Sequence, residues 1–100
     1  MTGRVDPSGV QVLLPGVLAD LAGGARRLSL DLPAGTLAEL LDALASAHPV
    51  LGRRLRDESG ALRRYVNVYV DGADVRGERG LETAVGPRAL VQVLPSVAGG

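Results

Sequence analysis

The sequence predicts an α+β domain: a mixed β-sheet with one main helix packed on one face and an extended C-terminal tail. Two observations predict this fold class. Stretches in which every second residue is apolar surround a single stretch in which apolar residues recur at helical spacing. The last alternating stretch runs directly into a short tail that ends in Gly-Gly. A hairpin, a helix and further strands, in that order, favour a sheet covered by the helix on one face.

The first two strands form the predicted hairpin. Residues 9–15, GVQVLLP, alternate apolar side chains, and Pro15 ends the strand because it has no N–H to donate. Residues 16–25 form a turn and loop with Gly-Gly as its hinge, and residues 26–33, RRLSLDLP, alternate again. The positions expected to share the inward faces are Val10, Val12, Leu14, Leu28, Leu30 and Leu32.

The apolar period then changes to that of a helix. Residues 36–48, TLAELLDALASAH, begin at Thr36, a suitable N-cap, and Glu39 stands three residues later, which is the capping-box pattern. Pro49 ends this helix, and a weak short helix with a polar turn follows over residues 50–62. The apolar stripe of the main helix consists of Leu37, Leu40, Leu41 and Leu44.

The remaining strands complete the sheet. Residues 64–72, RYVNVYVDG, alternate most clearly and end in an Asp-Gly hairpin turn, with a brief return over residues 73–77. Residues 80–87 form a loop or a single helical turn. Residues 89–95, ALVQVLP, form the last strand. We place it beside the first strand in the middle of the sheet, because it is apolar and must anchor the tail.

Composition limits the classes of function. Eleven acidic and eleven basic residues balance, so no net field favours nucleic acid or a membrane surface. There is no cysteine, and a lone histidine, His48, cannot form a metal site. The acidic pairs Asp57-Glu58 and Asp71/Asp74 stand in turn sequences, where aspartate serves the backbone. No catalytic triad, phosphate loop or dinucleotide motif is present. We therefore expect a protein that is not an enzyme and binds no cofactor or metal itself.

We expect residues 1–100 to form a single domain, with residues 1–8 loose and residues 95–100 as a mobile tail. No apolar run has the length of a membrane span and no signal peptide is recognisable, so a cytoplasmic location is expected. The arginines between residues 53 and 64 are interpreted as a solvated loop, with a dock for an acidic partner as the alternative.

The tail carries the candidate chemistry. Pro95 stops strand pairing and keeps Leu94 extended. Gly99 and Gly100 have no Cβ, so they can pass through a channel too narrow for other residues. The Gly100 carboxylate is a poor electrophile and becomes reactive only when a partner with ATP converts it to an acyl-adenylate. The alternative is a disordered tail without a function.

The whole pattern resembles the ThiS/MoaD family of sulfur carriers, which have a ubiquitin-like β-grasp fold. The resemblance covers nearly the whole chain, from VQVLLPGVLADLAGG to the end. RYVNVYVDGADVR together with VLPSVAGG is most similar to the CysO-like branch, whose members serve cysteine biosynthesis. Gly-Gly directly after a final strand, with the helix and the Val-Asn-Val strand in register, carries the resemblance.

The resemblance implies a reaction and a set of partners. An E1-like adenylating and sulfurtransferase enzyme would use Mg-ATP to form a Gly100 acyl-adenylate, and sulfide or a persulfide would displace AMP to leave a thiocarboxylate. In CysO-like pathways the thiocarboxylate attacks an aminoacrylate on pyridoxal phosphate in a cysteine synthase, and a zinc peptidase releases cysteine. Other family members serve the large subunit of molybdopterin synthase, a thiazole synthase for thiamin or a thiosugar synthase. Two alternatives stay open: a ubiquitin-like modifier conjugated through Gly100, or the small subunit of molybdopterin synthase.

Partners would grip the body of the carrier beside the root of the tail. Strand alternation places several apolar residues on the face opposite the expected core, where an apolar patch would form the dock. The alternative is that the protein's own loops cover them. The partner-binding residues expected are Leu13, Pro15, Tyr69, Leu90, Leu94, Pro95, Val97 and Ala98.

Overall fold

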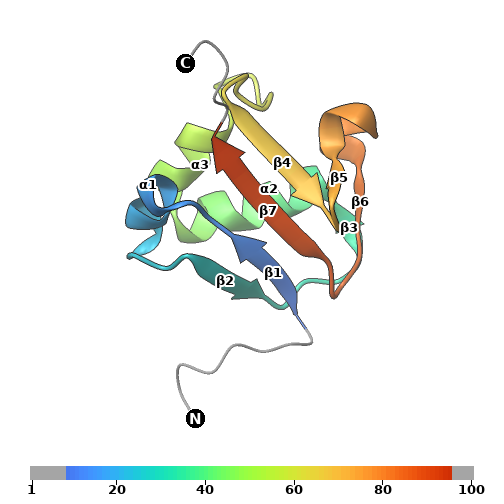
Figure 1. Ribbon diagram of the computed structural model, residues 1–100, viewed down its shortest axis with the longest axis horizontal. Coiled ribbons are helices and arrows are strands. Elements are labelled where there is room, and N and C mark those ends of the chain that lie inside the picture. Colours follow the sequence, from blue (N-terminus) through green and yellow to red (C-terminus); the bar gives the residue numbers. More distant parts are fainter. Residues whose placement is uncertain (1–8, 96–100) are drawn as a thin grey trace.

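The structure, a computed structural model, describes residues 9–95. A five-stranded sheet has the order β2-β1-β7-β4-β5, and a separate two-stranded sheet pairs β3 with β6. Helices α2 and α3 lie behind the five-stranded sheet in Figure 1. The strands are β1 (Val10–Leu13), β2 (Arg27–Leu30), β3 (Gly35–Thr36), β4 (Val66–Val70), β5 (Ala73–Asp74), β6 (Ala84–Val85) and β7 (Leu90–Pro95). The helices are α1 (Gly16–Ala19), α2 (Leu37–Ala47) and α3 (Pro49–Leu55), with 3₁₀ turns η1 (Asp20–Ala22), η2 (Val75–Gly77) and η3 (Gly80–Glu82).

Strand β7 is the central strand of the five-stranded sheet. It runs parallel to β1, with Val91 opposite Val12, and antiparallel to β4, with Val93 opposite Val68. Strands β1 and β2 form the antiparallel hairpin expected from their sequences. The position predicted for the last strand, beside the first and in the middle of the sheet, is therefore confirmed.

The core lies between the sheet and α2. Its largest fully buried side chains alternate along the strands and follow the helical stripe of α2: Val10, Val12, Val66, Val68, Val91, Leu37, Leu40, Leu41 and Leu44, with Leu51, Leu55 and Val75 from α3 and η2. The predicted capping box is present at the start of α2. The Glu39 amide donates to Thr36 Oγ1 at 3.3 Å, and the Thr36 amide donates to Glu39 Oε1 at 2.8 Å.

The structure differs from the sequence-based expectation at three places. The segment expected as a loop after β1 forms α1 and η1, and it buries Leu18, Ala19 and Ala22. Pro49 does not only end α2 but begins α3, because proline at the first helical position needs no hydrogen-bonded N–H. Strands β3 and β6 have only two residues each, too short for any alternation to predict them. None of the helices described between residues 9 and 95 combines the length and apolar character needed to cross a membrane.

The aspartates in the turn sequences serve the backbone, as predicted. Asp57 Oδ1 accepts hydrogen bonds from the hydroxyl and amide of Ser59 at 2.6 and 2.9 Å. These bonds, the hydroxyl bond first, hold the pKa of Asp57 below its usual value. Asp74 Oδ1 accepts from the Arg76 amide, and Asp71 Oδ1 accepts from the Leu90 amide, each at 2.9 Å. The latter bond ties the β4–β5 hairpin to the start of β7.

Helices α2 and α3 approach closely at Gly52, which is buried. A Cβ added there would lie 2.5 Å from Ala45 Cβ and 2.9 Å from Ala45 Cα. We expect Gly52→Ala to reduce the free energy of unfolding by about 1–3 kcal/mol, since this overlap outweighs the ~1 kcal/mol gain in helix propensity. Thermal or urea unfolding measures the loss.

Gly77→Ala is the matched control, because a Cβ there meets nothing within 4 Å. We expect it to change stability by less than about 0.5 kcal/mol. Adding Ala45→Gly to Gly52→Ala removes the contact with Ala45 Cβ and leaves that with Cα, so it should restore part of the stability. A Gly52→Ala protein as stable as the unsubstituted chain would show that the two helices move apart without cost.

Candidate functional site

The tail leaves the body from the middle of the sheet. Pro95 is the last residue of β7 and lies opposite Val66 of β4. Leu94 is 44% exposed although it belongs to the central strand. Four of the predicted site residues, Val97, Ala98, Gly99 and Gly100, lie outside the described residues. Their attachment point, Pro95, is paired with β4, while the pairing of β7 with β1 reaches only as far as Gln92.

One face of the five-stranded sheet has no helix over it and points toward the viewer in Figure 1; we call it the open face. Because side chains alternate along a strand, the residues between the buried valines lie on this face. Register places Leu13, Gln92 and Tyr69 in one row across three strands, and Leu94 beside Asn67 nearer the tail. The open face consists of Gln11, Leu13, Arg27, Ser29, Asn67, Tyr69, Leu90, Gln92 and Leu94.

The structure places four of the eight predicted docking residues on the open face. Leu13, Tyr69 and Leu90 are half-buried there and Leu94 is exposed. Leu90 is the first residue of β7 and lies at the opposite end of that strand from the tail, so the prediction that it lies beside the tail root is wrong. Pro15 lies off the strand, as the N-cap residue of α1. Its carbonyl accepts hydrogen bonds from two amides of that helix at 3.0 and 2.8 Å. Because β1 and β7 are parallel, it lies beyond β1 at the same end of the sheet as the tail root.

Polar side chains also lie on the open face. The sequence-based prediction of docking residues did not include them, because it looked for an apolar patch. Gln11 is 7% exposed, and its Oε1 accepts a hydrogen bond from Arg27 Nε at 3.0 Å. Asn67 Oδ1 accepts from an Arg76 Nη atom, also at 3.0 Å. Alternation alone could have placed Gln11 and Asn67 on this face. Arg76 belongs to η2, so only its tertiary contact reveals that it reaches the sheet.

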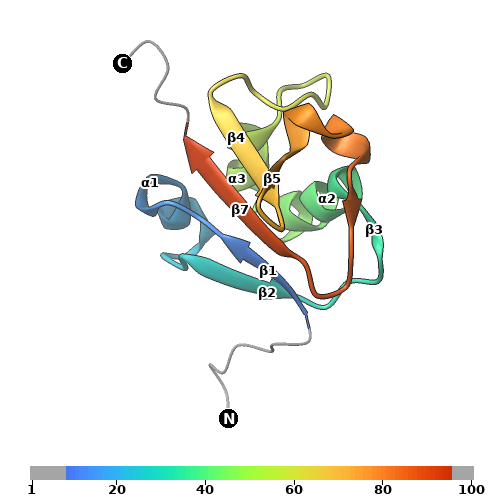
Figure 2. The same ribbon diagram turned by 45° about the vertical axis from the view of Figure 1, so that its right-hand side comes forward.

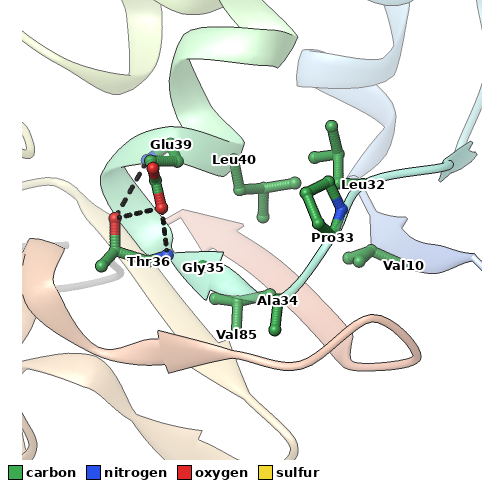
Figure 3. Close-up of a pocket in the computed structure, with 9 residues that line it drawn as sticks. All are labelled: Val10, Leu32, Pro33, Ala34, Gly35, Thr36, Glu39, Leu40 and Val85. Atoms are coloured by element: carbon green, nitrogen blue, oxygen red, sulfur yellow. Dashed lines mark hydrogen bonds between the residues drawn. The ribbon is translucent and has the colours of Figure 1, made fainter.

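A second candidate is an apolar pocket of about 200 Å³ at the opposite end of the sheet from the tail, shown in Figure 3. Its walls come from Val10, Leu32, Leu40 and Val85, among others. The one acid that lines it is Glu39, and the dashed lines in Figure 3 show its carboxylate bound within the capping box. Between residues 9 and 95 no group of three His, Asp or Glu side chains is placed to hold a metal ion. The pocket thus offers a small apolar volume without a polar group aimed at a ligand.

The protein has a ubiquitin-like β-grasp fold (Figure 2). Three features define it: the strand order, the helix that crosses one face of the sheet, and the exit of the chain from the central strand. Within that class, the ThiS family model matches residues 12–100, and the chain belongs to the ThiS family. The family predicted from the sequence is thus confirmed.

Three relatives illustrate the similarity. "Sulfur carrier protein CysO" of Mycobacterium tuberculosis is 38% identical over 93 residues, which cover 91% of this chain and 98% of the relative. A chain of the crystal structure of the Amycolatopsis orientalis BexX/CysO complex aligns with a TM-score of 0.81 and 36% identity, covering 92% of this chain and 100% of that one. The crystal structure of SAMP1 from Haloferax volcanii aligns with a TM-score of 0.76 and 30% identity, covering 91% and 98%.

Proposed function

We propose that this protein is a sulfur carrier for biosynthesis, with cysteine formation as the favoured branch. The observation that carries the proposal is the family match, which extends through the Gly-Gly end at residue 100. The similarity to CysO along 98% of that carrier's length supports the same role and branch. A tail rooted on the central strand suits a carrier, because the body stays folded while the end of the chain reacts elsewhere.

The proposed reaction takes place at the Gly100 carboxylate. One carboxylate oxygen attacks the α-phosphorus of ATP in an E1-like enzyme and releases pyrophosphate, which gives the acyl-adenylate. Sulfide then attacks the acyl carbon and AMP leaves, so a sulfur atom replaces an oxygen in the resulting thiocarboxylate. The partner supplies the ATP and Mg²⁺ site, and pyridoxal phosphate belongs to the acceptor enzyme. This chain supplies the carboxyl group, together with the tail and the open face that bring it to the partner's active site.

Presentation depends on the tail and the open face together. Residues 95–100, when extended, reach about 20 Å from the sheet at ~3.3 Å per residue. A partner whose active site lies at that depth must also hold the body, and the open face adjoins the tail root. We propose that partners dock there through Leu13, Tyr69, Leu90 and Leu94, with the tail threaded into the partner. Support comes from a CysO carrier that was crystallised in complex with BexX.

Two alternative roles share the same end of the chain. A small archaeal modifier protein is among the structures similar to this chain, which favours a ubiquitin-like modifier as the second candidate. In that role the activated Gly100 carbonyl would be attacked by a protein amine rather than by sulfide. A third role is the small subunit of a molybdopterin synthase, in which the thiocarboxylate would donate its sulfur to the large subunit.

Mass spectrometry of the protein isolated from its own cells tests the proposal. We expect a species about 16 Da heavier than the carboxylate form, because sulfur replaces oxygen. Oxidation of the single methionine adds nearly the same mass, so the shift must be assigned to the tryptic peptide of residues 89–100, which contains no methionine. Treatment with iodoacetamide should alkylate the thiocarboxylate in that peptide and leave the carboxylate form unchanged.

Each alternative gives a different mass pattern. Conjugates joined through Gly100 to lysines of other proteins would support the modifier and overturn the carrier. A peptide 89–100 found only as the plain carboxylate, in cells grown with ample sulfur and active in cysteine synthesis, would also overturn it.

A further inference from the structure

The geometry points to two-point recognition of an acidic partner by Arg27 and Arg76. Resting on the proposed docking of partners on the open face, we propose that this pair selects partner surfaces that carry two separated carboxylates with an apolar ridge between them. Both arginines are exposed, and both reach the open face through a hydrogen bond to a side-chain amide.

The first step is how each guanidinium is held. Arg27 uses Nε to donate to Gln11 Oε1 at 3.0 Å. Arg76 donates through one terminal nitrogen to Asn67 Oδ1 and through the other to the Arg63 carbonyl, each at 3.0 Å. Amide and carbonyl oxygens orient a guanidinium without neutralising its charge. Each cation is thus fixed in direction and keeps its full attraction for an outside carboxylate.

The second step is where the two cations lie. Arg27 stands on β2 opposite Leu13 of β1, and Asn67, which holds Arg76, stands on β4 opposite Leu94 of β7. Strands β2 and β4 are three inter-strand spacings apart, about 14 Å. The apolar residues of β1 and β7 lie between them. The arginines therefore stand on either side of the strand that continues into the tail.

The third step concerns acids on the same face. Among the described residues the one ion pair joins Arg56 to Asp42, on the helical side of the molecule, so no carboxylate of residues 9–95 lies within salt-bridge distance of Arg27 or Arg76. Asp74 is the acid nearest in register, opposite Tyr69. Its carboxylate oxygen accepts from the backbone amide of Arg76 and caps η2 rather than pairing with the guanidinium.

Between the two cations, which no described carboxylate neutralises, lie the apolar side chains of Leu13, Leu90 and Leu94 together with Gln92. This arrangement defines the partner surface that would fit. The partner must place carboxylates opposite both arginines and apolar side chains between them, and turning it about the sheet normal by less than a half-turn separates the two pairs. Such charges speed encounter and fix orientation more than they add contact area. Oriented docking aims the tail at the partner's channel, so the arginines act as positioning residues for Gly100.

Steady-state assays with the purified E1-like enzyme of the same organism test this inference through ATP–pyrophosphate exchange driven by the full-length carrier. We expect Arg27→Gln and Arg76→Gln each to raise the KM for the carrier about 3- to 5-fold, and Arg27→Glu with Arg76→Glu to raise it about 30-fold or more, with kcat nearly unchanged. Arg88→Glu is the matched control, because Arg88 is exposed in the turn before β7, at the far end from the tail. It should change the KM less than about twofold.

Salt separates charge recognition from a structural role. Raising the ionic strength from ~0.05 to ~0.5 M should bring the unsubstituted carrier close to the double variant, because the attraction is screened. Unchanged melting temperatures of the variants exclude misfolding. If the double glutamate variant does not fold, the two glutamine variants provide the test instead. A double variant with the KM of the unsubstituted chain, or a KM difference that salt does not reduce, would overturn the inference and leave the carrier proposal intact. Failure of the unsubstituted chain to support exchange would overturn both.

Discussion

Removal of Gly100 is expected to lower ATP-dependent activation by a factor on the order of 1000 or more, measured as ATP–pyrophosphate exchange with the E1-like partner. The deletion withdraws the terminal carboxylate by about 3.5 Å along an extended chain. A reacting oxygen must approach within about 3–3.5 Å of the atom that it attacks, and a misplacement of ~1 Å can already cost about 100-fold. The open face stays intact, so the shortened carrier should still bind and compete with the full chain.

The same deletion should leave the folded body almost unaffected. Within residues 9–95, the part of the chain that the structure describes, the buried side chains come from residues 10–93. We therefore expect the melting temperature to change by less than about 2 °C. Gly100→Ala is the matched control, because it keeps the length of the tail and adds one methyl group. It therefore separates the effect of a shorter tail from the effect of a narrow channel in the partner. A large loss of stability on deletion, or normal exchange by the shortened chain, would contradict a reactive end presented away from the body.

Gly99→Val is expected to reduce exchange about 100-fold or more without shortening the tail. Valine adds a β-branched side chain beside the reacting carboxyl group, and it excludes backbone angles that glycine adopts freely. If the partner's channel admits only bare backbone at this point, the carboxylate stops short of the α-phosphorus. Exchange at saturating carrier measures the effect, because docking of the body should persist.

Ala98→Val is the control for added bulk one residue earlier. Ala98 already carries a Cβ, so we expect a loss of about tenfold or less there. Gly99→Ala should fall between the unsubstituted chain and Gly99→Val. Normal turnover by Gly99→Val would show that the channel is wide at this position, and that glycine is not required by its size.

Much of the fold could be predicted because its strands and main helix bury one face each. The alternating valines of β4 and β7 and the leucines of α2 are buried as their spacing predicts. The Thr36 capping box and the turn at Asp71 were also predictable, because both depend on neighbouring residues. Asp71 has φ 50°, which suits the Asp-Gly turn expected there.

The remainder depends on contacts between distant parts of the chain. Nothing in the local sequence pairs Gly35 with Val85, which join β3 to β6. Likewise, Arg76 reaches Asn67 only after β4 and β5 have folded into a hairpin. Alternation indicated the apolar half of the open face. The arginines at the open face could be identified only from the tertiary structure. The reaction expected at the tail was indicated by the family resemblance.

The placement of β7 has a mechanical consequence. Any protein that pulls on the end of this chain, whether an enzyme drawing the tail inward or an unfoldase extracting it, transmits force along the axis of β7. The hydrogen bonds to β4, which reach Pro95, run across that axis, and those to β1, which reach Gln92, are slanted to it, so both sets of bonds are loaded in shear. The chain end is thus attached to a strand with two hydrogen-bonded neighbours, which share the load when the tail is pulled.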